Sequence, residues 1–259
     1  MLQPLTPEAR QVMASYNLGM PTVEYRTKFT VRKSIAVAIL FAGGLGFLVV
    51  AILGSSSLLL SAVIAVVILS VMCLAAAMWT VVDAVQSRDI HVYVCPGGLL
   101  YQHSGKTEAI RWDQVEAFWQ KVVRTYRYGI YTGSTHRYTL RRYDGATFKF
   151  NDNIHNVEAL GNAIAGESAR TLWPRSIAAY QAGQTLSFGK ISLNQQGVSD
   201  GKELLPWYQV KEIKVNRGFL SIKKEGNKRG NWKLIQASTI PNVGVFVALV
   251  NYIQSSKRR

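Results

Sequence analysis

Arginine and tyrosine side chains alternate in one stretch of the chain, residues 123–138, which reads VRTYRYGIYTGSTHRY. Guanidinium groups bind carboxylates and stack on aromatic rings, and aromatic residues with arginine are enriched where proteins contact one another. The alternative is a solvated strand hairpin stabilised by cross-strand tyrosine pairs. We expect a partner protein to contact six residues of this stretch: Arg124, Tyr126, Arg127, Tyr128, Tyr131 and Arg137.

A second group of candidate side chains is basic and lies in residues 223–233, which read KKEGNKRGNWK. Each basic side chain near an anionic bilayer contributes about 1 kcal/mol of attraction, so such a group could hold the chain on a lipid surface. The alternative is a solvated face. The residues expected to contact anionic lipid are Lys223, Lys224, Lys228, Arg229 and Lys233.

Side chains for catalysis or metal binding are scattered. The two cysteines, Cys73 and Cys95, are too few for a zinc cluster. No nucleophile motif or phosphate loop occurs. We therefore expect no catalytic residue, no metal, no cofactor and no enzyme activity, with an enzyme of unrecognised site as an alternative. None of the four histidines has metal-ligand spacing with another: His91, His103, His136 and His155.

The net charge of +15 also raises the question of nucleic acid. A nucleic-acid-binding protein of this charge would be expected to show a basic helix or repeated aromatic residues for base stacking. Neither pattern occurs in the sequence. We therefore expect no nucleic-acid partner.

An apolar segment over residues 34–83 holds one formal charge, Asp83, and a Gly-Ser-Ser-Ser sequence divides it. Its two parts, residues 34–53 and 58–82, are each long enough for a bilayer core about 30 Å thick. Two buried core helices are the alternative, but such helices usually keep a polar stripe. The sequence therefore predicts a transmembrane hairpin of two helices.

Basic residues beside this segment indicate its orientation. They precede the first span, as Arg26, Lys28, Arg32 and Lys33, and Arg88 follows the second. Because basic residues gather on the cytoplasmic side, we expect a multi-pass protein of the cell inner membrane. Both termini, including an N-terminal segment over residues 1–33, would then lie in the cytoplasm.

The chain after the apolar segment contains an internal repeat. Trp112 with Gln114-Val115 matches Trp207 with Gln209-Val210. A glycine precedes each tryptophan, and an Ile-x-Asn-Val sequence follows it, in the same order. Three matching landmarks predict a duplication, with one domain over residues 84–170 and a second over residues 171–259. The six landmark residues of the outer pairs are Gly98, Gly197, Ile154, Asn156, Ile240 and Asn242.

Each half has short runs of β-branched and aromatic residues separated by turn signals, which predict about six or seven antiparallel strands. Asn156 and Asn242 are expected to cap one closing helix in each half. A separate linker helix is expected over residues 174–182. Trp112 and Trp207 are expected to be buried rather than to bind a ligand. The predicted fold class is α+β, with two tandem small β-barrels, each closed by a C-terminal helix.

The stretches GLLYQHSGKTEAIRWDQVEAF (98–118) and GVSDGKELLPWYQVKEI (197–213) carry a resemblance to a known group. The chain resembles bacterial membrane-anchored proteins with tandem pleckstrin-homology-like (PH-like) domains, which form an uncharacterised family. The resemblance implies PH-like barrels and a membrane location, but no common activity.

The expected function is therefore a membrane-anchored scaffold or accessory module, which binds partner proteins or a larger membrane complex at the cytoplasmic surface. The alternative is a sensor of anionic lipid that uses the basic second domain.

Overall fold

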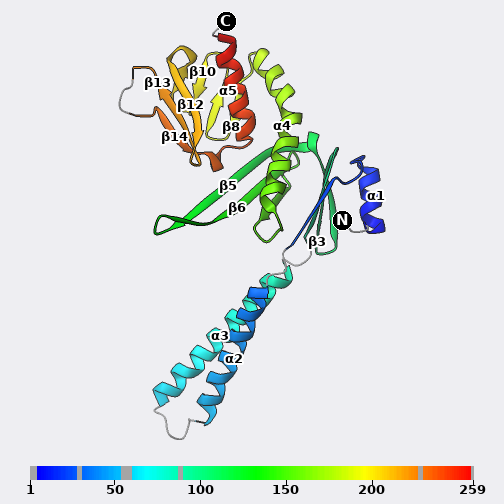
Figure 1. The fold of residues 1–259 in the computed structure, drawn as a ribbon, viewed down its shortest axis with the longest axis vertical. Helices are drawn as coiled ribbons and strands as arrows, with labels where there is room; N and C mark the ends of the chain where they lie inside the picture. Colours follow the sequence, from blue (N-terminus) through cyan, green and yellow to red (C-terminus); the bar gives the residue numbers. More distant parts are fainter. Residues whose placement is uncertain (1–4, 28–30, 54–59, 87–89, 227–229, 258–259) are drawn as a thin grey trace. The chain divides into compact units, whose positions relative to one another are not determined.

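The computed structural model describes residues 5–27, 31–53, 60–86, 90–226 and 230–257 (Figure 1). The chain divides into two compact units. The helical unit comprises Arg26–His91 with Gln102–Lys106. The β-rich unit comprises Met1–Tyr25, Val92–Tyr101 and Thr107–Arg259.

The helical unit contains two helices, α2 (Val31–Leu53) and α3 (Leu60–Gln86), which lie side by side (Figure 1). The Ser70 hydroxyl of α3 donates to the Gly44 carbonyl of α2 over 2.7 Å. A Cβ atom added at Gly44 would lie 2.9 Å from Cγ of Leu74. Glycine at this position therefore lets the two helices approach closely.

The expected transmembrane hairpin is wrong. Among the residues that the structure describes, one helix is long and apolar enough to cross a membrane, Val63–Val82 within α3. The described apolar stretch of α2, Ala38–Val49, is shorter.

The helical unit is inserted into a β-hairpin. The Thr27 amide donates to the Ile90 carbonyl (3.1 Å), and the Ile90 amide donates to the Thr27 hydroxyl (3.2 Å). These bonds tie the two ends of the insertion together. The flanking strands β1 (Val23–Arg26) and β2 (His91–Cys95) are neighbours in one sheet. Part of the N-terminal segment over residues 1–33 is therefore a strand of the first half.

The first half consists of helix α1 (Pro7–Ser15), two antiparallel sheets and helix α4 (Val157–Gln181). Ala9 and Met13 of α1 pack against Tyr93, Cys95 and Leu100. The four-stranded sheet has the order β1-β2-β3-β4, with β3 Gly98–His103 and β4 Lys106–Arg111. After the 3₁₀ turn η1 (Trp112–Gln114) follow β5 (Val115–Arg127), β6 (Ile130–Arg142) and β7 (Thr147–Asn151).

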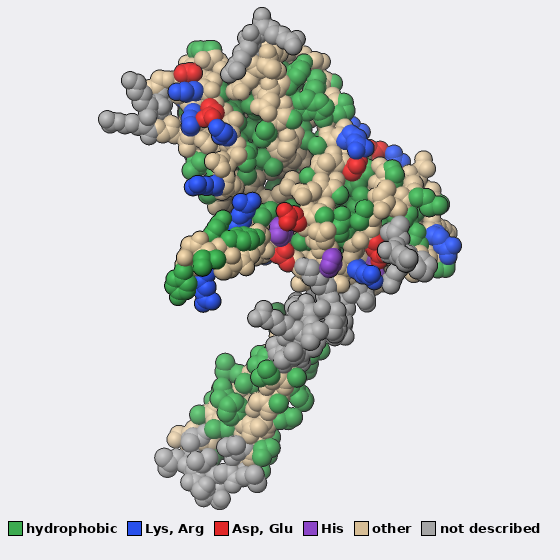
Figure 2. Space-filling view, viewed as in Figure 1, with side chains coloured by type: hydrophobic (Ala, Val, Ile, Leu, Met, Phe, Trp, Pro, Cys, Tyr) green, Lys and Arg blue, Asp and Glu red, His purple; other side chains and the backbone are tan. Residues whose placement is uncertain are grey.

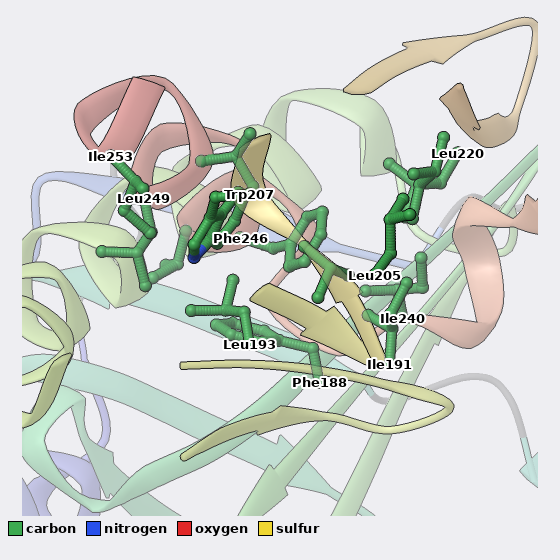
Figure 3. Close-up of a cluster of buried hydrophobic side chains, with 14 of the residues drawn as sticks. Phe188, Ile191, Leu193, Leu205, Trp207, Leu220, Ile240, Phe246, Leu249 and Ile253 are labelled. Atoms are coloured by element: carbon green, nitrogen blue, oxygen red, sulfur yellow. The ribbon is translucent and has the colours of Figure 1, made fainter. Parts of the chain in front are cut away.

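The second half has the same order of elements. A four-stranded sheet contains β8 (Leu186–Phe188), β9 (Ile191–Leu193), β10 (Gly197–Ser199) and β11 (Leu204–Pro206). After η2 (Trp207–Gln209), a three-stranded sheet contains β12 (Val210–Asn216), β13 (Phe219–Lys224) and β14 (Lys233–Gln236). The turn η3 (Ala237–Thr239) and helix α5 (Val243–Lys257) close this half. Its core gathers apolar side chains from both sheets and α5, among them Leu205, Trp207, Leu220 and Phe246 (Figure 3).

The expected tandem PH-like barrels are also wrong. Within the described ranges, the strands form four small antiparallel sheets, and none of these closes into a barrel. The reason lies at the two tryptophan turns. In each half the 3₁₀ turn η1 or η2 stands between the last strand of one sheet and the first strand of the next. Strand pairing therefore stops at that point rather than continuing around a closed sheet.

The repeated residues pack in the same way in both halves. Nε1 of Trp112 donates to the Cys95 carbonyl (3.1 Å), and Nε1 of Trp207 donates to the Asn194 carbonyl (2.8 Å). These carbonyls lie at or directly after the ends of β2 and β9. Both tryptophans are buried. The repeated tryptophan therefore has a structural role in each half.

Helix α4 belongs to both halves. It is continuous through residue 170, where the sequence suggests a domain boundary, and it contains Pro174. Val157 and Leu160 near its start are buried, whereas Leu172 and Trp173 belong to the core of the second half. The closing helix of the first half and the expected linker helix are thus one element.

Candidate binding surface

The β5–β6 hairpin extends beyond the sheet in which it begins. Strand β7 pairs with β6 only over Arg137–Arg141, whereas β5 and β6 remain paired as far as Arg127 and Ile130. We call residues 122–135, which form the part beyond β7, the ribbon. Tyr128 and Gly129 turn its tip with φ values of 51° and 81°, and a two-residue turn of this sign matches the twist of paired strands.

The matching hairpin of the second half is shorter. Strands β5 and β6 have 13 residues each, whereas β12 has 7 and β13 has 6. The second hairpin also turns through two residues of positive φ, Arg217 and Gly218. The ribbon is therefore an elongation of a hairpin that both halves share.

The ribbon presents large apolar side chains to solvent. Tyr128 is 96% exposed and Ile130 is 71% exposed, and apolar side chains gather at its tip (Figure 2). The rings of Tyr126 and Tyr131 meet edge to face at 5.8 Å. Such pairs help to hold two strands together, but a two-stranded hairpin alone is only marginally stable in water.

The structure brings together five of the six residues expected to bind a partner. The five are at the far end of the ribbon: Arg124, Tyr126, Arg127, Tyr128 and Tyr131. Arg137 instead lies at the base, opposite Lys121 in the strand register. The sequence pattern therefore identified the hairpin. It did not distinguish the residues at the far end of the ribbon from Arg137 at its base.

Arg137 lines a groove of about 410 Å³ on the β5-β6-β7 sheet. Arg141 is held there by Glu116 through two hydrogen bonds of 2.7 Å and lies over the ring of Trp119, 5.1 Å from its centroid. Within the described residues no acidic side chain pairs with Lys121 or Arg137. The lining residues are Trp119, Lys121, Arg137, Thr139, Arg141, Thr147 and Ser238.

Two of the five basic residues expected to contact lipid are paired with carboxylates of the second half. Lys223 lies 2.8 Å from Glu212, and Lys233 lies 2.6 Å from Asp200. Hydrogen bonds from Lys214 and Lys223 lower the pKa of Glu212 to about 2. The Lys233 hydrogen bond, with two backbone amides, lowers the pKa of Asp200.

Of the remaining residues expected to contact lipid, Lys224 is half-buried on β13. Lys228 and Arg229 lie outside the described residues. Two of the five candidates thus have their charge balanced by carboxylates of the same half, which weakens the case for a basic lipid-binding face.

Sequence reasoning missed a polar group at the base of the ribbon. Nδ1 of His136 lies 2.9 Å from Oδ1 of Asp152, and the His136 amide donates to Oδ2 of Asp152 over 2.8 Å. Glu158 lies 3.7 Å from the other ring nitrogen. Burial, followed by the charges of Glu158 and Asp152, raises the pKa of Tyr138. These residues connect β6, the segment after β7 and the start of α4, so we interpret the group as structural.

A side-chain group that binds a metal ion, or a reactive thiol, would be the next candidate for chemistry in the described part of the chain. No group of three or more histidine, cysteine or acidic side chains there could hold a metal ion. Cys95 is buried, and burial raises the pKa of its thiol to about 11. A thiol of that kind remains protonated at neutral pH and reacts poorly.

Asn242 connects the two halves at the edge of β5. Its amide donates to the Phe118 carbonyl (2.8 Å), its Oδ1 accepts from the Phe118 amide (2.9 Å), and its Nδ2 donates to the Glu116 carbonyl (2.9 Å). The expected helix cap is therefore wrong for Asn242, because its side chain bonds to β5. Asn156 does stand at the N-cap of α4, as expected, but its side chain makes no cap bond.

Replacing Asn242 with alanine is expected to destabilise the protein by at least about 3 kcal/mol. Two hydrogen bonds would be lost, with about 1 kcal/mol for each and a further cost for the unpaired groups on β5. Alanine would also have to adopt a φ near 51°, which costs about 1 kcal/mol. Denaturant unfolding of the purified protein would measure the change.

Asn156→Ala is the matched control. Asn156 has a φ of 53° but no side-chain cap bond. This variant should lose only the backbone contribution, about 1 kcal/mol. Equal losses in the two variants would show that the bonds to β5 contribute nothing.

The comparisons with known proteins give a family but no activity. No curated protein matches the chain in sequence. A family model described as "Family of unknown function" matches residues 1–259. The chain therefore belongs to this family, DUF6585.

Proposed function

We propose that the protein is a membrane-attached binding protein, in which α3 inserts into a membrane and the ribbon binds a partner protein. The observation that carries this proposal is the ribbon itself. It extends past β7, and it exposes Tyr128 almost fully and Ile130 largely to solvent. Exposed aromatic and arginine side chains on a projecting hairpin suit recognition of another protein.

The surface of α3 supports attachment to a membrane. Only 11% of its apolar window Val63–Val82 is buried within the structure, whereas the core helix of a soluble protein is mostly buried. Trp79, near the end of this window, is exposed and suits the interface between lipid and water. The basic residues that flank the helical unit favour the cytoplasmic face of the cell inner membrane as the location of the β-rich unit.

The two other functions considered from the sequence have less support. A lipid sensor based on residues 223–233 would need free basic side chains, but Lys223 and Lys233 are paired with Glu212 and Asp200. An enzyme would need a cavity in which a nucleophile or a general acid or base lies within reach of its partner groups. The groove instead has basic, hydroxyl and tryptophan side chains, which favour binding over catalysis.

Photocrosslinking in intact cells would test this function. A photoreactive residue at Tyr128 is expected to form a discrete adduct with another polypeptide in the membrane fraction. The control position is Tyr208, which is 79% exposed on η2 of the second half and should form no such adduct. Identical adducts from both positions, or an adduct with lipid alone from Tyr128, would contradict the proposal.

A further inference from the structure

One edge of β5 is partly covered and partly open. Asn242 of the second half bonds to this edge at Glu116 and Phe118. It satisfies both backbone groups of Phe118, as a neighbouring strand would. The first part of the edge is therefore occupied, by one backbone amide and the side-chain amide of Asn242.

The strand register shows which groups point outward beyond this contact. The backbone groups of Phe118 point away from β6, because Asn242 occupies both of them. In an antiparallel pair this outward direction recurs at every second residue. The amides and carbonyls of Gln120, Val122 and Arg124 therefore face outward from the same edge.

No group in the described chain occupies these outward positions. Outside its pairing with β6, the backbone of Gln120, Val122 and Arg124 makes no hydrogen bond to any described residue. Natural proteins usually cover or charge such a long edge, because it can pair with any extended chain. An open edge of this kind is how several domains bind peptides by adding a strand.

The charges beside the edge indicate the partner's chemistry. Residues 117–135 contain Lys121, Arg124 and Arg127 but no acidic residue. Lys121 also lies directly opposite Arg137 in the register, and like charges in that position repel each other. An acidic side chain on an added strand would relieve this repulsion.

We propose that the open edge of β5, from Gln120 to Arg124, binds an extended acidic segment of the partner protein as an additional strand. This inference rests on the function proposed above and specifies the partner's chemistry. Backbone hydrogen bonds supply affinity, and Lys121 with Arg137 selects for acidic side chains. A lipid headgroup has no peptide backbone to pair with the edge, and a second ribbon of the same chain would bring basic residues together.

The test uses the full chain in detergent micelles and a fluorescent peptide of alternating glutamate and threonine. Saturable binding is expected by fluorescence anisotropy. Val122→Pro removes one outward amide while leaving the pairing with β6, since proline is tolerated at outward positions of edge strands. It should weaken binding about tenfold, which corresponds to 1.4 kcal/mol. Val122→Thr keeps the amide and should bind like the unaltered protein.

Two further peptides separate the contribution of the backbone hydrogen bonds from that of the charges. The glutamate–threonine peptide with alternate amides methylated should bind at least about tenfold more weakly. This experiment alters the peptide and leaves the protein unchanged. A lysine–threonine peptide should not bind. Equal affinity for Val122→Pro and Val122→Thr, or equal binding of the methylated peptide, would overturn strand addition. Absence of saturable binding, or binding to anionic vesicles in place of the peptide, would also overturn it.

The outcome can be separated from that of the proposed function. The anisotropy experiment reports on the edge of β5, whereas crosslinking from Tyr128 reports on the ribbon tip. A polypeptide adduct at Tyr128 together with unaltered peptide binding by Val122→Pro would leave the function standing and remove the inference. Failure of crosslinking would remove the function itself.

Discussion

Replacement of residues 28–89 by the two residues Gly-Lys is expected to yield a folded protein that no longer sediments with membranes. The second half contains the template for this change. There, β8 and β9 are joined by Gly189-Lys190 alone, with Phe188 paired to Ile191. Thr27 and Ile90 occupy the corresponding place and are already bonded to each other. The shortened hairpin should therefore close without strain.

Membrane fractionation followed by circular dichroism would check both parts of this result. The exposed apolar surface of α3 would be absent from the shortened protein, so the protein should remain in the supernatant after centrifugation. It should also keep its β-sheet signal. A matched control replaces the insertion with an unrelated apolar helical hairpin, which should restore sedimentation. A shortened protein that stays in the membrane pellet would show that the β-rich unit carries its own membrane attachment.

Gly197→Ala is expected to unfold the second half, with a loss of roughly 3 kcal/mol or more. A Cβ atom at Gly197 would lie 2.1 Å from the Leu205 carbonyl oxygen. This contact is with backbone, so no side-chain rotation can relieve it. Strand β10 would have to separate from β11, which exposes the fully buried side chains of Val198 and Leu205.

Thermal unfolding followed by tryptophan fluorescence would measure this effect, because Trp207 is buried next to the affected strands. Gly244→Ala is the control. A Cβ atom there meets nothing within 4 Å, and Gly244 lies in α5, where alanine favours the helix by up to about 1 kcal/mol. A Gly197→Ala protein as stable as this control would show that the two strands are not packed as described.

The repeated landmarks predicted the common order of elements because each acts locally. Gly98 occupies the place of Gly197, and a Cβ atom there would lie 2.2 Å from the Ile110 carbonyl oxygen. Trp112 and Trp207 each donate to a carbonyl at or directly after the end of a strand. Residues with such specific local contacts leave a pattern in the sequence that can be recognised without the fold.

Local sequence patterns could not show whether the strands close into a barrel. Alternating strand patterns indicate that a strand exists but not where its pairing ends. Strand β1 was missed for a related reason, since the helical insertion separates it from its neighbour β2. A four-residue strand has too little pattern of its own to be recognised next to a long apolar segment.

The candidate site was predicted in part. The tyrosines and arginines of the ribbon give residues 123–138 an unusual composition, which made this stretch a candidate from the sequence. The bonds from Asn242 to β5 carry none, because they join residues 124 and 126 positions apart. Their cause is tertiary packing, whereas asparagine before a helix normally indicates a cap.

The most direct measurement of whether the ribbon binds a partner at the membrane is the reactivity of a cysteine at its tip. Of the two native cysteines, the partly exposed Cys73 would first be replaced by serine. Cys95 is buried, and its thiol pKa is raised to about 11, so it should not interfere. Tyr128→Cys should react with a polar maleimide at least about tenfold more slowly in native membranes than in the purified protein, whereas Tyr208→Cys should react equally in both. Equal rates for Tyr128→Cys in the two preparations would contradict the account, because the ribbon tip would then be free where its partner should cover it.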